Sequence, residues 1–155
     1  MTTQLAEQNA VQTLNVVKEI TIEASVQIVW ESILEEMGPA STGPDGAPMM
    51  MKVEPWPGGR WLRDLGEGAG HLWGHVQVIK PPKLLELCGP MFMSYPVMNH
   101  VQYRLTPAAD GATKLKLTHR AIGLIDPEHM SGVSLGWGHI IEGVRRIALR
   151  RAGKR

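Results

Sequence analysis

Hydrophobic and polar residues follow two different periods along the chain. In residues 14–22, hydrophobic side chains recur at alternate positions, which predicts a strand with one buried face. In residues 26–37 they recur at helical spacing, and Ser25 directly before them is a suitable N-cap. Because Gly38 and a proline follow, we expect the helix to end there.

Glycine and proline interrupt this pattern between residues 38 and 59, a segment of 22 residues with five of each. We expect a loop there, around one short strand at residues 49–53. Further strands are predicted at residues 60–65, 70–80, 83–88, 98–106 and 113–123. Only short turn-like segments separate them, which favours an antiparallel meander over a parallel sheet.

The last two predicted strands form a hairpin whose register follows from parity. The inward residues of the two strands lie opposite one another only when the loop between the strands has an odd number of residues. A loop of three residues, 109–111, meets this condition. In that register Tyr103 faces Leu117, and Val101 faces His119. The sequence therefore predicts that His119 points inward among hydrophobic neighbours.

A long C-terminal helix is predicted to begin at Asp126 and Pro127. Its hydrophobic stripe consists of Val133, Trp137, Ile140, Ile141, Val144 and Ala148. Glycines at positions 132, 136, 138 and 143 each destabilise it by about 1 kcal/mol relative to alanine. Such a helix either approaches another backbone closely or leaves room beside itself. We expect it to cover the concave face of the sheet and to enclose a hydrophobic cavity against it.

Composition is that of one soluble domain, with 155 residues of which 43% are hydrophobic and 20% charged. We expect a disordered tail over residues 1–13 and a single domain over residues 14–152. The net charge of +1 gives no reason to expect nucleic acid as a partner. No hydrophobic run reaches the ~20 residues of a membrane span. With no signal-peptide pattern and one cysteine, Cys88, a cytoplasmic location is expected.

The ionisable residues suggest no metal site. His71 and His75 share a strand face but lie roughly 13 Å apart at ~3.3 Å per residue, too far to bind one ion. The sequence contains no HExxH motif and no cysteine pair, so we expect neither a metal nor a cofactor. Glu31, Glu35 and Glu36 are interpreted as the solvated face of the first helix.

Polar groups on the predicted concave face are the remaining candidates for chemistry. His119, Tyr103 and Asn99 either orient a ligand in a cavity or are core residues with hydrogen-bond partners. A third interpretation makes His119 a general base, although no activating partner is visible in the sequence. The residues expected to bind a ligand are Trp61, Trp73, Met91, Phe92, Met93, Asn99, Tyr103, His119 and Trp137. The segment GPMFMSYP is interpreted either as a lid or as a cap on the core.

Several motifs, taken in order, resemble one known family. They are IEASVQIVWESI, GGRW, GHVQVIKPPKLLEL, VQYRLTPAADGATKLKLTHRAIG and a GW pair in the final helix. Over residues 15–151 the chain resembles the activator-of-heat-shock-protein-90-ATPase homologue family, part of the START-like (SRPBCC, birch-pollen-allergen-like) superfamily. The resemblance implies an α+β helix-grip fold, in which a curved antiparallel β-sheet wraps around a long C-terminal α-helix. It also implies two short helices that close one end.

The resemblance further implies binding of a hydrophobic small molecule, of lipid, polyketide or aromatic type, between the sheet and the C-terminal helix. One alternative is a cyclase-like or hydrolase-like enzyme with His119 and Tyr103 as acid–base groups. Another is a protein-interaction module like the eukaryotic co-chaperone, which carries an additional N-terminal domain that these 155 residues do not include. We favour binding. The sequence leaves open whether the chain forms a homodimer.

Overall fold

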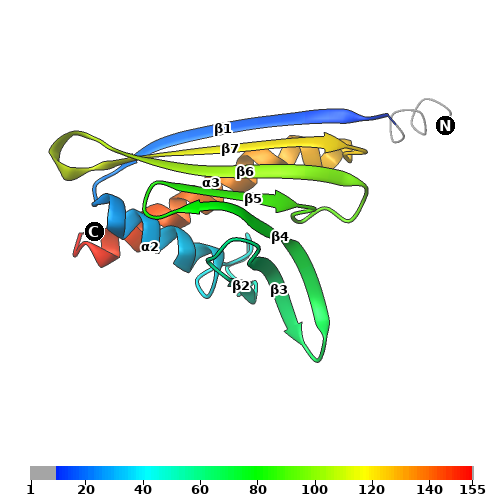
Figure 1. Cartoon of the computed structure of the whole chain (residues 1–155), viewed down its shortest axis with the longest axis horizontal. Helices are drawn as coiled ribbons and strands as arrows, with labels where there is room; N and C mark the ends of the chain where they lie inside the picture. Colours follow the sequence, from blue (N-terminus) through cyan, green and yellow to red (C-terminus); the bar gives the residue numbers. More distant parts are fainter. Residues whose placement is uncertain (1–9, 155) are drawn as a thin grey trace.

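A curved sheet grips one long helix in the computed structural model, which describes residues 10–154 (Figure 1). The strands are β1 (Gln12–Ile22), β2 (Met51–Val53), β3 (Arg60–Gly66), β4 (Ala69–Lys80), β5 (Leu84–Gly89), β6 (Val97–Pro107) and β7 (Thr113–Gly123). Helix α2 (Val26–Met37) follows β1, a 3-10 turn η1 (Ala109–Gly111) joins β6 to β7, and helix α3 (Pro127–Arg151) follows β7. The order across the sheet is β1-β7-β6-β5-β4-β3-β2, so the predicted meander is confirmed, with β1 added beside β7.

The β6–β7 hairpin has the predicted register. Val101 lies opposite His119, and both side chains are fully buried. The backbone N–H of Ala108 donates to the carbonyl of Ala112 at 2.8 Å, which closes a turn of three residues. Gly111 in that turn adopts a φ of 75°, a left-handed conformation that glycine adopts readily. The inward direction of His119 is therefore confirmed.

Every predicted strand is present, with ends that differ by at most two residues. β1 begins at Gln12, inside the segment expected to be a disordered tail, and the first nine residues of that segment lie outside the described residues. β2 is shorter than predicted because Met50 adopts a φ of 57°, which no strand accommodates. The resemblance implied two short helices, but the chain between β1 and β2 forms only α2, since glycine and proline interrupt residues 38–50.

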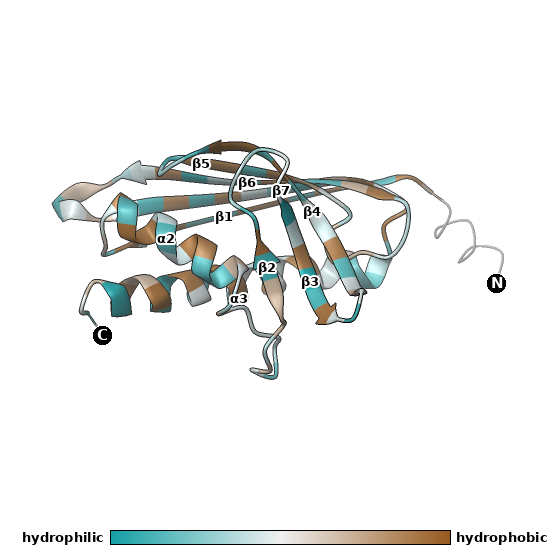
Figure 2. Cartoon of the chain, turned by 60° about the horizontal axis from the view of Figure 1, so that its bottom comes forward, coloured by the Kyte–Doolittle hydropathy of each residue, from teal (hydrophilic) through white to brown (hydrophobic). Residues whose placement is uncertain are grey.

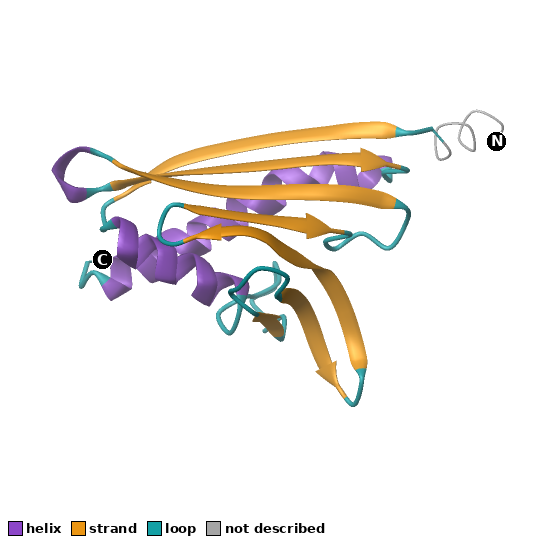
Figure 3. Ribbon diagram, viewed as in Figure 1, coloured by secondary structure: helices purple, strands orange, loops and turns teal. Residues whose placement is uncertain are grey.

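Both helices lie on the same side of the sheet (Figures 2 and 3). The side chain of Ser25 caps α2 by accepting from the backbone N–H of Ile28, and Asp126 caps α3 by accepting from Glu128. The inward residues of β6 and β7 bury their side chains together with those of α2 and α3. β3 and the adjoining half of β4 bend away from the other strands (Figure 1).

Two glycines lie where β4 and β5 come close together at this bend. A Cβ on Gly74 would lie 2.6 Å from the carbonyl oxygen of Cys88, and a Cβ on Gly89 would lie 2.5 Å from the Cα of Gly74. Next to them, the backbone N–H of Met91 donates to the carbonyl of Trp73 at 2.7 Å. The close approach therefore fixes the segment after β5 against β4.

Gly74→Ala should lower the free energy of unfolding by about 2 kcal/mol, because the methyl group would overlap backbone atoms that must shift. The matched control is Gly138→Ala in α3, where an added Cβ meets no atom within 4 Å. That variant should gain up to about 1 kcal/mol from helix propensity. Urea denaturation measures both, and equal stabilities of the two variants would contradict the role of the close approach.

Candidate functional site

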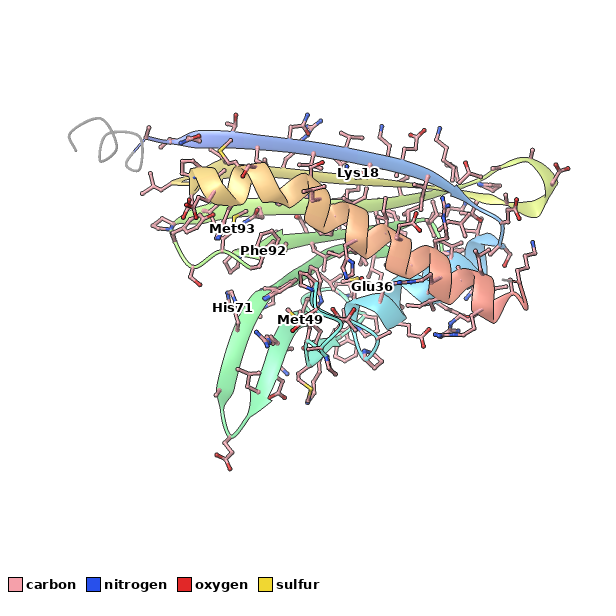
Figure 4. All side chains as sticks on the ribbon, turned by 180° about the vertical axis from the view of Figure 1, so that it is seen from behind. Lys18, Glu36, Met49, His71, Phe92 and Met93 are labelled. Carbon is pink, nitrogen blue, oxygen red and sulfur yellow. The ribbon has the colours of Figure 1, made fainter. Side chains whose placement is uncertain are left out.

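A cavity of about 620 Å³ opens between the first half of α3 and the bent part of the sheet. Three segments outside α3 contribute to its wall: the end of α2 with the loop that follows it, strands β3 and β4, and the loop between β5 and β6. Figure 4 shows Glu36, Met49 and Phe92, which line the cavity, on the side of the sheet that carries α3.

Aromatic side chains form the sheet side of the cavity. The rings of Trp61 and Trp73 meet edge-to-face with centroids 5.0 Å apart, and Trp73 meets Phe92 in the same way at 5.8 Å. The indole N–H of Trp61 donates to the carbonyl of Met37 at 2.9 Å. That bond satisfies the polar atom of Trp61 at the end of α2, and the ring packs in the cavity wall with only 3% of the residue exposed.

The helical side of the cavity combines large residues with glycines. Val133, Trp137 and Ile140 line it, and so do Gly132 and Gly136. A Cβ added to either glycine would meet no atom within 4 Å. A glycine-rich helix either approaches another backbone closely or leaves room beside itself. At positions 132 and 136 the structure shows room beside the helix.

His119 lies behind this wall in a continuous chain of hydrogen bonds. The indole N–H of Trp137 donates to Nδ1 of His119 at 2.8 Å, and Nε2 of His119 lies 2.6 Å from Oδ1 of Asn99. Because an indole N–H can only donate, Nδ1 accepts and the proton lies on Nε2, which donates to Asn99. Asn99 in turn donates through Nδ2 to the carbonyl of Pro90 at 3.1 Å.

This chain holds His119 in its neutral form. Burial lowers the pKa of the imidazole from 6.5 to about 4, since a charged ring would lose its hydration. Both ring nitrogens are already bonded within the core, so neither is available to accept a proton from a ligand. The arrangement matches the core-residue interpretation of His119 better than the ligand-orienting or the catalytic one.

Tyr103 is fully buried beside Trp137, with ring centroids 6.4 Å apart. Its hydroxyl has no hydrogen-bond partner among residues 10–154. Burial, with a smaller contribution from the nearby carboxylate of Glu36, raises the pKa of the phenol well above its usual range. A phenol that stays protonated in this way is a poor general base.

Glu36 corrects the interpretation of the first helix as carrying three solvated carboxylates. Glu31 and Glu35 are partly exposed and accept from Arg151 at 3.2 and 3.0 Å. Glu36 instead is buried, with 7% of its surface exposed, and lines the cavity. No hydrogen bond or ion pair reaches its carboxylate from residues 10–154. Burial raises the pKa of this carboxyl from 4.5 to about 8, so it is protonated at neutral pH.

A signal for Glu36 does exist in the sequence. Val29, Ile33 and Glu36 follow one another at spacings of four and three, which places all three on one helix face. A glutamate on the buried face of an amphipathic helix is a candidate for a functional carboxylate, because burial of a charge without a partner is costly.

The loop between β5 and β6 caps the core and also reaches the cavity. Met91 and Met93 are each 1% exposed, whereas Phe92 between them lines the cavity. Farther along the loop, the hydroxyl of Tyr95 lies 2.7 Å from Nδ1 of His129 on α3. The loop is therefore bonded to the helix across one side of the cavity.

The structure brings four of the nine sequence-predicted ligand residues to the cavity, namely Trp61, Trp73, Phe92 and Trp137. The other five, Met91, Met93, Asn99, Tyr103 and His119, are buried and do not line it. Sequence reasoning missed Glu36, His129 and Met49, which do. In residues 10–154 no three potential metal ligands come together, and no helix is long and apolar enough to cross a membrane.

Known structures share this architecture. MLL2253 from Mesorhizobium loti is 21% identical, with a TM-score of 0.62 over 88% of this chain and 97% of that one. SA2116 from Staphylococcus aureus, a protein of unknown function, is 12% identical, with a TM-score of 0.68 over 93% and 98%. CalU16 from Micromonospora echinospora is 17% identical, with a TM-score of 0.59 over 90% and 86%. At these identities the likeness concerns the fold, and no curated protein matches the chain.

The fold and the pocket define a helix-grip domain of the START-like class, whose members commonly bind hydrophobic ligands. The profile of the family described as Activator of Hsp90 ATPase homolog 1-like protein matches residues 45–148. The chain belongs to that family.

Stability should fall in acid through His119. The pKa of His119 is about 4 in the folded protein against an ordinary 6.5. Between these pH values the unfolded chain therefore binds a proton at this imidazole, whereas the folded protein does not. The neutral histidine therefore makes its full contribution to the free energy of unfolding above pH 6.5. As the pH falls toward 4, this contribution is lost, on the order of 3 kcal/mol. His119→Gln, which can still accept and donate, should lack this loss in urea denaturation at pH 7, 5.5 and 4.5. The control is His75→Gln, at an exposed position of β4. If His119→Gln loses as much stability in acid as the wild type does, His119 is not the source of the acid sensitivity.

Glu36→Gln should stabilise the ligand-free protein at neutral pH. Because the folded carboxyl has a pKa of about 8 against 4.5, wild-type stability falls as the pH rises between those values. A neutral amide of the same size does not titrate, so the variant should gain on the order of 3 kcal/mol at pH 7. Chemical denaturation between pH 5 and 8.5 measures the gain. Glu35→Gln, one residue earlier and paired with Arg151, should show no such pH-dependent gain.

Proposed function

We propose that the cavity between α3 and the bent sheet binds a hydrophobic small molecule. The single observation that carries this proposal is a space of about 620 Å³ walled by the rings of Trp61, Trp73, Phe92 and Trp137. Small-molecule sites usually measure about 300–1,000 Å³ and combine mostly apolar walls with a few polar groups. A lipid, a polyketide or an aromatic compound could each bury its apolar surface against such a wall.

The glycines of α3 support the same proposal. Gly132 and Gly136 weaken the helix by about 1 kcal/mol each relative to alanine, and no contact with another element requires their lack of a side chain. What their small size does provide is volume in the cavity, because both line it. Ligand binding gives this otherwise unfavourable choice of residue a physical reason.

The alternative functions have less support. An enzyme that uses His119 and Tyr103 would need those groups to face the ligand, and neither lines the cavity. No observation in residues 10–154 favours the co-chaperone alternative. Location in the cytoplasm and formation of a homodimer stay predictions.

Filling the cavity from α3 should weaken binding of a hydrophobic probe. We expect Gly136→Leu to weaken binding of the uncharged fluorophore N-phenyl-1-naphthylamine at least about tenfold, since the isobutyl group would occupy the space between Trp137 and the opposite wall. Titration followed by probe fluorescence measures the affinity. Urea denaturation of the same sample establishes that the variant is folded.

The matched control is Gly138→Leu, the same substitution two residues along the helix at a position that does not line the cavity. It should bind the probe as the wild type does. Equal affinity of the two variants would contradict binding in this cavity, as would a wild-type protein that binds no probe.

A further inference from the structure

The carboxyl group of Glu36 is the most unusual polar feature of the cavity. It comes from the last turn of α2, where its Cγ lies 3.4 Å from the position that a Cβ on Gly143 of α3 would occupy. The side chain is therefore held in the contact between the two helices. It is more than nine-tenths buried, it lines the cavity, and no group in residues 10–154 bonds to it.

An unpartnered buried carboxyl is unfavourable in the empty protein. Buried polar groups are normally hydrogen-bonded, and an unsatisfied one destabilises the fold by about 1–3 kcal/mol. Nothing in the fold of α2 requires an acid at this position, because its neighbours on the same face are Val29 and Ile33. A ligand that supplies the missing partner would explain the residue.

The cavity wall contains two acidic side chains and no permanently charged basic one. Glu36 and Glu128 line it, together with His129 and His139, whereas no lysine or arginine does. Arg146 lies near Glu36, with one guanidinium nitrogen 3.7 Å from the position that a Cβ on Gly143 would occupy, but it does not line the cavity. Arg151 is bound to Glu31 and Glu35. An anionic amphiphile would therefore meet two acidic groups and no lysine or arginine, whereas a cationic one can pair with Glu36 once the carboxyl has lost its proton.

The aromatic walls favour a cation as well. Trp61, Trp73, Phe92 and Trp137 line the same space as Glu36. Ring faces attract ammonium groups, and the attraction grows when water is excluded. Burial of an ammonium ion still requires an ion pair, because the loss of its hydration is too costly otherwise. Glu36 is the buried carboxyl that can provide one.

We propose that the cavity selects hydrophobic amines, with the apolar body among the aromatic side chains and the protonated nitrogen bonded to the carboxylate of Glu36. This selectivity rests on the proposed ligand-binding function of the same cavity. It assigns the chemical class of the ligand and the residue that recognises it.

Binding of the amine is then linked to one proton. In the free protein near pH 7 the carboxyl of Glu36 carries a proton, since burial raises its pKa to about 8. On binding, the O–H bond of the carboxyl breaks, the proton passes to the solvent, and the ammonium ion donates to the resulting carboxylate. Affinity for an amine should therefore rise as the pH rises toward 8, by up to about tenfold per unit.

Other ionisable groups lie close to Glu36 and enter the design of the experiment. Tyr103 faces it from β6, Arg146 lies beside Gly143 on α3, and His129 and His139 line the cavity from α3. Histidine ordinarily titrates near neutral pH. Measurements on Glu36→Gln, in which all four of these groups are retained, separate their contribution from that of the carboxyl.

The experiment compares three ligands of one shape: 2-naphthylmethylamine, 2-naphthalenemethanol and 2-naphthoate. Isothermal titration calorimetry of the full chain between pH 6 and 8.5 gives their affinities. Two buffers of different protonation enthalpy give the number of protons released. We expect the wild type to prefer the amine over the alcohol by at least about tenfold at pH 8 and to release close to one proton at pH 7.

Glu36→Gln should lose the preference for the amine over the alcohol, and binding of the amine should no longer release a proton. Glu35→Gln, whose carboxylate faces Arg151 instead of the cavity, is the matched control and should behave as the wild type does. Urea denaturation establishes that both variants are folded.

Each other result has a defined meaning. If the alcohol binds more tightly than the amine and weakens above pH 8, Glu36 donates a hydrogen bond to a neutral ligand, and the amine proposal is wrong. A preference for 2-naphthoate, or an amine preference that survives in Glu36→Gln, also overturns it, although ligand binding stands. If none of the three ligands binds, and N-phenyl-1-naphthylamine does not bind either, the proposed function itself fails.

Discussion

The hydrogen bond from Trp137 to His119 determines where α3 lies over the sheet. A helix that packs on a sheet through hydrophobic contacts alone can slide, because such contacts have little directionality. The indole N–H has one acceptor at 2.8 Å on β7, and that acceptor is itself oriented by Asn99 on β6. Asn99 then bonds to Pro90 at the start of the loop that carries Phe92. One polar chain thus positions the helix, two strands and one wall of the cavity.

Burial has opposite consequences for His119 and Glu36. Both side chains lose nearly all contact with water, so both are kept neutral at pH 7, the histidine by a lowered pKa and the glutamic acid by a raised one. His119 is bonded at both ring nitrogens, and its neutrality therefore stabilises the core. Glu36 has no such partner and borders empty space. The same physical effect makes one residue structural and leaves the other available to a ligand.

The fold was largely predictable because its signals are local. Alternation along residues 113–123 and an odd loop at residues 109–111 were enough to place His119 opposite Val101, and the observed register agrees. The partner of His119 was harder to find, since Trp137 lies 18 positions away on another element and no periodic pattern links the two. Tyr103 was correctly placed facing inward, but its distance from the cavity depends on how α3 packs.

Of the residues that line the cavity, only the aromatic ones were predicted from the sequence. Trp61, Trp73, Phe92 and Trp137 stand out in composition, and all four line the space. Glu36 was assigned to solvent because it was grouped with Glu31 and Glu35 on the first helix, although its helical spacing from Ile33 places it on the buried face. The wall formed by residues 41–44 could not be anticipated, because the path of a loop rich in glycine and proline is set by contacts made after the chain has folded.

Taken together, the glycines and Glu36 make the empty cavity an unstable arrangement that the sequence nevertheless maintains. Gly132 and Gly136 weaken α3, and the buried carboxyl loses most of its hydration without gaining a bond. Alanine at the two exposed glycines would strengthen the helix, and an apolar residue in place of Glu36 would avoid the burial of a carboxyl. A ligand that occupies the space and bonds to the carboxyl would restore much of that stability by mass action, because it binds only the folded state. The unfavourable residues line the cavity, whereas the chain of hydrogen bonds from Trp137 to Pro90 lies behind its wall and is fully bonded. That separation is the pattern expected when a rigid scaffold supports a site that is completed by its ligand.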